Sequence, residues 1–229
     1  MWRFILKGLA LCFLCTQASA VTISPLVIEL NTDHRLTSQL VVTNNSTKKI
    51  ALETSVHRLS FSSNGMTRIQ SSADKNVLVF PPAALLAPGK LQTFRVQWVS
   101  NTPLKMSESY FIRFSNIQIN QGNQELGKTK NLQTGINVQI NYNALLHVYS
   151  SSLQPEVKIN IGKEGNLILT NSGNRFTFTS KLHFKNLDHH FIEALYETIG
   201  DQFVPPYSTH TFDPSSQHLP VGTYYGYEQ

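Results

Sequence analysis

The chain has 229 residues, of which 41% are hydrophobic and 14% are charged. This hydrophobic share is too high for a disordered chain, and the length allows one large domain or two of ordinary size. The formal net charge is +5, and the basic residues are scattered, with no run of five or more. A basic tail that binds nucleic acid is therefore excluded from the leading interpretations.

The first 20 residues have the composition of a secretory signal peptide. Arg3 and Lys7 make the start positive, an apolar stretch follows from residue 8 to 15, and Ala18-Ser19-Ala20 matches a cleavage site of small residues. The stretch is shorter than the roughly 20 apolar residues with which a helix spans a membrane. A lipoprotein signal at Cys15 and an ordinary buried N-terminal helix are the alternatives.

Cleavage after Ala20 would remove both cysteines, Cys12 and Cys15, although exported proteins enter a compartment in which disulfides form. Without Arg3 and Lys7, 17 of the 19 basic side chains would remain beside 14 acidic ones, a net charge of +3. The stability of the exported chain must then come from hydrophobic cores, which a chain of this length can form.

Alternating apolar and polar residues predict most of the secondary structure as β-strands. In chain order, the first strands are expected at residues 38–43, 51–61, 66–69, 77–80, 94–98, 110–119 and 134–149. Asn64-Gly65 is a strong signal for a tight hairpin turn after the second of them. The polar segment 121–133 contains two glycines and is expected to be a loop.

A linker is expected at residues 150–155, and shorter strands follow it. These strands are expected at 157–161, 167–170, 176–184 and 191–199, the last of them in competition with a helix. Many short strands separated by turns are typical of β-sandwiches. We therefore expect an all-β protein with a signal peptide at 1–20 and two unequal sandwich domains at 21–151 and 152–229.

Residues 122–129 match the phosphate-binding pattern G-x-x-x-x-G-K-[ST], which is typical of NTPases. That chemistry needs a helix directly after the threonine, because the amides at a helix N-terminus bind the phosphates. Here Thr129 is followed by a short polar segment and then by a strand rich in β-branched residues. A solvated hairpin loop is therefore the preferred interpretation, and we expect neither a nucleotide nor another cofactor.

No constellation of residues indicates catalysis or a metal site. His189 and His190 are adjacent, but neighbours on a strand point to opposite faces, and no further cluster lies nearby at ligand spacing. The sequence has no G-x-S-x-G motif, and no cysteine would remain as a nucleophile after cleavage. We therefore disfavour a secreted hydrolase and expect a protein that binds other proteins.

Three segments stand in an order that resembles the PapD-like periplasmic chaperones of the chaperone–usher pilus pathway. They are Phe80 to Gly89, with its prolines and the arginine-containing strand after it; Glu108 to Phe114, with its Glu-Ser-Tyr-Phe start; and Tyr142 to Val148. The resemblance extends from Val21 to about Ser180. The last of the three segments is more similar to the alternate and archaic branches of the family.

The resemblance implies two immunoglobulin-like sandwiches in a boomerang arrangement. It also implies donor-strand complementation, in which the last strand of the first domain completes the sheet of a pilus subunit. On this chain the strand would be Gln133 to Tyr142, with Ile136, Val138, Ile140 and Tyr142 as the inserted row. A long apolar edge also needs a partner to prevent aggregation. The alternative is that this row faces the protein's own core.

Chaperones of this family often hold the terminal carboxylate of the subunit with an arginine on the first strand and a lysine on the donor strand. Here residues 21–30 contain no basic side chain, and the lysine position falls near Leu145. Arg95, Arg113 and His147 are the remaining candidates, since the planar fork of arginine suits a carboxylate. For the arginines, surface or interdomain pairing is the alternative role.

The resemblance thus implies a periplasmic chaperone that caps pilus subunits and delivers them to an outer-membrane usher. Self-association of the free protein through the donor strand stays open, and no nucleic acid partner is expected. The competing hypothesis is a secreted structural or adhesive β-sandwich protein, such as a pilus subunit. A subunit would carry a donor extension before a single domain, whereas this chain has two domain-sized blocks. The second block is short, so we expect it to be trimmed or to lack a strand.

Overall fold

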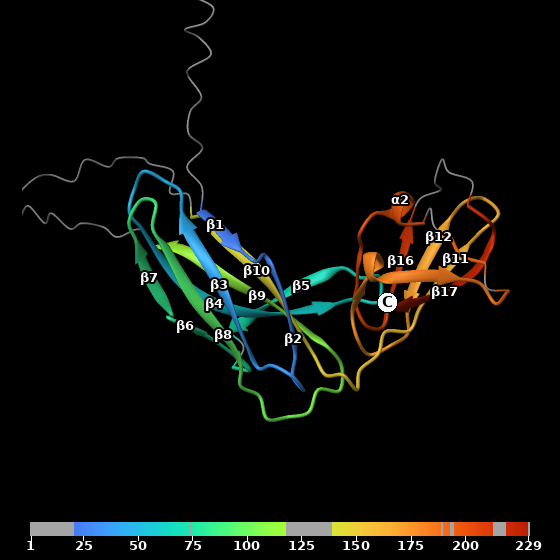
Figure 1. Ribbon diagram of the computed structural model, residues 1–229, viewed down its shortest axis with the longest axis horizontal. Helices are drawn as coiled ribbons and strands as arrows, with labels where there is room; N and C mark the ends of the chain where they lie inside the picture. The colour runs from blue at the N-terminus through green and yellow to red at the C-terminus, as the bar shows by residue number, and fades with distance from the viewer. Residues whose placement is uncertain are drawn as a thin grey trace, which may run out of the picture.

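The computed structural model describes residues 21–73, 75–117, 139–188, 190–192, 195–212 and 219–228. Two β-sandwich bodies follow one another along the chain, and Figure 1 shows them joined at one end in the expected boomerang arrangement. Each body has its own buried apolar cluster, formed by residues between Ile28 and Val148 in the first and between Val157 and Tyr224 in the second. The all-β, immunoglobulin-like architecture expected from the sequence is therefore confirmed.

One sheet of the first body has four strands in the order β1-β3-β8-β6. Their bounds are β1 Val21–Ser24, β3 Thr37–Asn44, β8 Leu91–Trp98 and β6 Val77–Phe80. Side chains alternate between the two faces of a strand, which decides what is buried. On β8, Phe94 and Val96 are fully buried in the sandwich, whereas Arg95 between them is exposed on the outer face.

The other sheet of this body has six strands, in the order β2-β10-β9-β4-β5 with β7 also paired to β4. Their bounds are β2 Val27–Asn31, β10 Asn141–Tyr149, β9 Glu108–Ile117, β4 Ile50–Phe61, β5 Thr67–Ala73 and β7 Ala83–Leu86. Phe114 of β9 packs edge-on against Phe94 of the opposite sheet, with ring centroids 4.9 Å apart. The expected turn at Asn64-Gly65 joins β4 to β5, and Gly65 has a φ of +76°, which glycine adopts at little cost.

The first strand changes sheets at Pro25. β1 pairs antiparallel with β3 in the four-stranded sheet, whereas β2 pairs in parallel with β10 in the six-stranded sheet. Proline has no amide hydrogen to donate to a ladder, so strands are readily interrupted there. As a result, β2 covers β10 only from Leu145 to Tyr149. Among the described residues, no strand pairs with the edge of β10 at Asn141–Ala144 on this side.

The second body contains a five-stranded sheet in the order β14-β17-β11-β12-β16 and a two-stranded sheet, β13-β15. Their bounds are β11 Val157–Ile161, β12 Leu167–Asn171, β13 Thr177–Phe178, β14 Leu182–Lys185, β15 Phe203–Val204, β16 Ser208–Phe212 and β17 Gly222–Glu228. The last strand, β17, lies inside the larger sheet, between β14 and β11.

Two expected strands of the second body are wrong. The segment 176–184 is divided into β13, the 3-10 turn Thr179–Lys181 and β14. The segment 191–199 contains the helix α2, Leu195–Ile199. Leu195 and Ile199 are four residues apart, lie on one face of the helix and are both buried in the second core, so packing favours the helix here.

Candidate functional site

The predicted donor row, Ile136, Val138, Ile140 and Tyr142, precedes and overlaps the start of β10, where the side chains of this face become exposed. Ala144, Leu146 and Val148 are fully buried, and Tyr142, on the same face, is half-buried against this core. Ile140 comes next on that face, immediately before β10, and is 49% exposed. The row therefore passes from the protein's own core into solvent. Ile136 and Val138, the other two predicted members, lie outside the described residues.

The edges of the two sheets lie next to each other at this point. On the side of β10 away from β9, no described strand pairs with Asn141–Ala144, and β1 forms the edge of the opposite sheet. Val21 and Ile23 of β1 are partly buried and pack against the first core. Backbone hydrogen-bonding groups that no strand satisfies therefore lie next to partly exposed apolar side chains, an arrangement to which another strand can be added.

The structure does not bring the three candidate carboxylate-binding residues together. Arg95 lies on the outer face of the four-stranded sheet. Arg113 lies on the outer face of the six-stranded sheet, where its Nε donates a 3.1 Å hydrogen bond to Oδ1 of Asn143. Of the three candidates, only Arg113 thus lies beside the unpaired edge of β10.

His147, the third candidate, is buried where the two bodies meet. Its ring stacks on Phe203 and lies against Phe176, with centroid distances of 4.7 and 4.6 Å, and Nδ1 is 2.8 Å from Oγ of Ser109. Burial, with a smaller contribution from the charge of Lys181, lowers the pKa of His147 to about 4. The side chain is therefore neutral near pH 7, and a ligand would reach it only if the two bodies separated.

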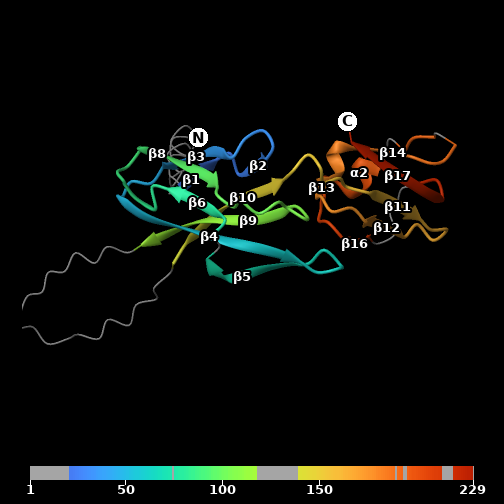
Figure 2. The ribbon, with the colours of Figure 1, turned by 90° about the horizontal axis from the view of Figure 1, so that it is seen from below.

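Three further hydrogen bonds join the two bodies. The amide of Thr209 donates a 2.7 Å hydrogen bond to the carbonyl of Ser63, at the tip of the β4–β5 hairpin. Figures 1 and 2 both show this hairpin reaching the second body. On the other side, the amide of Ser107 donates to the carbonyl of Asn174 at 2.9 Å, and Oγ of Ser107 accepts from the amide of Phe176 at 2.9 Å.

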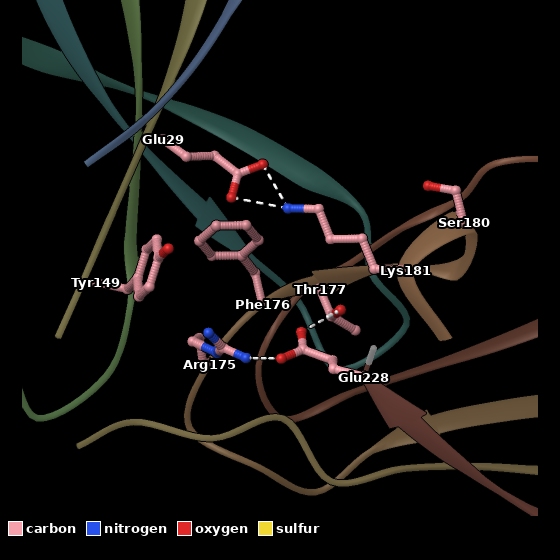
Figure 3. A pocket seen from close by; sticks show the side chains of 8 residues that line it. All are labelled: Glu29, Tyr149, Arg175, Phe176, Thr177, Ser180, Lys181 and Glu228. Atoms are coloured by element: carbon pink, nitrogen blue, oxygen red, sulfur yellow. Dashed lines mark hydrogen bonds and ion pairs between the residues drawn. The ribbon is translucent and has the colours of Figure 1, made fainter. Parts of the chain in front are cut away.

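A pocket of about 330 Å³ opens between the two bodies. It is lined by Glu29, Tyr149, Arg175, Phe176, Thr177, Ser180, Lys181 and Glu228. In Figure 3, Lys181 reaches across to Glu29, with Nζ 2.7 Å from Oε1, and Arg175 forms an ion pair with Glu228. Both cations of the pocket therefore already have internal carboxylate partners.

Sequence reasoning missed Arg175 and Lys181 as residues of this pocket. They lie in a turn and a 3-10 segment, where no local pattern distinguishes them from solvated surface residues. Arg175 enters the pocket because the second body folds back on Tyr149, and its guanidinium carbon lies 5.2 Å from the centre of that ring. The expected boomerang arrangement predicts a pocket between the domains, but it does not identify the residues that line the pocket.

Two weaker sequence signals fall partly or wholly beyond the described residues. The phosphate-binding pattern at 122–129 and His189 lie outside them. Within the described ranges, no group of three or more His, Cys, Asp or Glu side chains could hold a metal ion. None of the described helices is long and apolar enough to cross a membrane.

Comparison with solved structures identifies the fold. A chain from the CsuC–CsuE chaperone–tip adhesion subunit pre-assembly complex of archaic chaperone–usher Csu pili of Acinetobacter baumannii is 14% identical, with a TM-score of 0.53 over 85% of this chain and 90% of that one. A chain from the Salmonella enterica complex of the SafA pilin with the SafB chaperone is also 14% identical, with a TM-score of 0.53 over 93% and 98%. The class 5 fimbriae chaperone CfaA is 18% identical, with a TM-score of 0.52 over 85% of each chain. No protein-family model and no curated protein matches the sequence. The chain therefore has the fold of PapD-like pilus chaperones.

Proposed function

We propose that this protein is a periplasmic chaperone that binds pilus subunits by donor-strand complementation and delivers them to an outer-membrane usher. The observation that carries the proposal is the start of β10, where an unpaired strand edge coincides with a row of apolar side chains that leaves the protein's own core at Tyr142 and Ile140. Two of the similar folds were solved in complexes whose names pair a chaperone with a tip subunit or a pilin.

The edge of β10 supplies affinity and its side chains supply selectivity. A subunit strand beside Asn141–Ala144 would satisfy backbone groups that face solvent in the free protein, at about 0.5–1.5 kcal/mol for each hydrogen bond. Ile140, with Val138 and Ile136 before it in the sequence, would enter the incomplete core of the subunit. Full burial of one such side chain contributes about 1.5–3 kcal/mol. This binding requires no nucleotide and no catalytic group.

A subunit carboxylate has limited access to the cations of the molecule. In the interdomain pocket it would have to displace Glu29 from Lys181 or Glu228 from Arg175. Arg113 is more accessible, because its partner is the neutral Asn143 beside the unpaired edge. We therefore propose Arg113 as the contact for a subunit carboxylate, and Arg113→Gln should weaken subunit capture.

The test is co-purification with the subunits encoded next to the gene for this chain. Ile140→Asp places a charge in the proposed contact and should weaken subunit capture at least about 100-fold, since a buried unpaired carboxylate adds to the lost apolar contact. Leu78→Asp is the matched control, because Leu78 is 56% exposed but lies on β6, at the far edge of the other sheet.

Circular dichroism and urea unfolding show whether each variant is folded. A wild-type complex that Ile140→Asp removes and Leu78→Asp leaves intact supports the proposal. Equal capture by the wild type and Ile140→Asp contradicts it. If the wild type captures no subunit, the alternative of a structural or adhesive sandwich protein moves ahead.

A further inference from the structure

A strip of three apolar side chains crosses the outer face of the six-stranded sheet beside the unpaired edge of β10. The strand register places Phe111 of β9 opposite Leu145 of β10, and Leu145 opposite Val27 of β2. Val27 is 41% exposed, while Phe111 and Leu145 are half-buried. Leu26, just before Val27 at the same edge of the sheet, is 61% exposed.

The strip has a defined boundary on each side. Two residues along the strands, about 7 Å away, Ser109 and His147 are buried under the second body. Two residues the other way, the face becomes polar at Arg113 and Asn143. An apolar band about one row wide therefore lies between the second body and a polar surface.

A subunit strand that pairs with the unpaired edge of β10 would end next to this band. A strand beside Asn141–Ala144 would continue the line of β2, because β2 occupies the same side of β10 from Leu145 onward. It would meet Leu26, whose carbonyl already accepts a 2.8 Å hydrogen bond from the amide of Leu145. The incoming chain must therefore leave the plane of the sheet, and the inner face is closed by the first core. Only the outer face, where the strip lies, is open to it.

We propose that the strip binds an apolar side chain at the end of the subunit strand, so that this protein selects subunits that are apolar at that position. The inference rests on the proposed function, since it names the kind of subunit side chain that contacts Leu145, the residue next to the unpaired edge. No charged side chain belongs to the strip, and its nearest acidic neighbour on this face, Glu29, is paired with Lys181. A lysine of the subunit would therefore lose water there without gaining a free carboxylate.

The test is a competition within one periplasm. Tagged wild type and an untagged variant are expressed together with a limiting amount of the subunit encoded next to the gene, and the ratio of the two complexes gives the relative affinity. Leu145→Lys should lose roughly 10- to 100-fold against the wild type, whereas Leu145→Met, which stays apolar, should stay within about threefold. Val27→Lys repeats the test at a more exposed position, which tolerates a polar side chain more easily.

A second arm tests direct contact. Replacing the last apolar residue of the subunit strand by Lys should weaken binding to the wild type. Replacing it by Asp should restore at least tenfold of the loss with Leu145→Lys. If folded Leu145→Lys and Val27→Lys compete as well as the wild type while Ile140→Asp still abolishes capture, the strip does not bind the subunit, and the proposed function stands. Absence of any complex with the wild type overturns the proposed function itself.

Discussion

His147 makes the junction between the two bodies sensitive to acid. The ring lies between Phe176 and Phe203, and burial, followed by the charge of Lys181, lowers its pKa from 6.5 to about 4. The charged groups that face it from the two bodies are Lys181 and Glu29, and they are paired with each other. Protonation of His147 would thus bury a positive charge next to a carboxylate, Glu29, that is already paired with Lys181.

The direction and size of the effect follow from proton linkage. Exposed in the unfolded chain, His147 takes up a proton near pH 6.5, whereas the folded protein takes it up only near pH 4. Between these values the unfolded state binds more protons, so stability falls as the pH is lowered. The contribution is fully present above pH 6.5. About 2.5 pKa units correspond to a loss of about 3 kcal/mol by pH 4.

Urea unfolding of the wild type and of His147→Phe between pH 7.5 and 4 measures this contribution. The carboxylates of the protein add their own pH dependence, so the difference between the two curves is the relevant quantity. His147→Phe should remove about 3 kcal/mol of the decline between pH 6.5 and 4. Parallel curves for the wild type and His147→Phe would refute the reasoning.

Two other substitutions examine the contacts between the bodies. Gly65→Ala should destabilise the protein by more than about 1 kcal/mol in urea unfolding, because Gly65 has a φ of +76° and a Cβ would lie 2.1 Å from Cε1 of His210; unchanged stability would show that the hairpin tip does not press on the second body. Lys181→Ala should cost less than about 1 kcal/mol, since the Lys181 and Glu29 side chains are 45% and 30% exposed. Thermal unfolding at low and high salt measures it, and a large loss that persists at high salt would contradict a solvent-screened pair.

The strands and the hairpin could be predicted because their signals are local. Alternation predicted the strand in which Phe94 and Val96 are buried and Arg95 is exposed, and Asn64-Gly65 marked its turn without reference to the rest of the chain. At 191–199 the strand was expected in competition with a helix, and α2 forms because Leu195 and Ile199 pack into the second core, a contact that is not local.

The site was harder to predict, because strand partners and domain contacts are not local properties. Pro25 interrupts the first strand, but nothing local in the sequence shows that this interruption leaves one side of Asn141–Ala144 without a neighbour among the described residues. His147 sits on an alternating strand like any polar outward residue, and its burial comes from Phe176 and Phe203, which are distant in sequence. The apolar opposition of Val27 and Leu145 likewise depends on a register that the sequence does not display.

Amide hydrogen exchange at the start of β10 tests the central claim most directly. In the free protein, the amides of Asn141–Ala144 that point to the unpaired edge should exchange rapidly, whereas those of Leu146–Val148, inside the sheet, should be protected. In a purified complex with a pilus subunit, the account predicts that the same Asn141–Ala144 amides become protected. A stable complex in which they still exchange as fast as in the free protein would contradict the account.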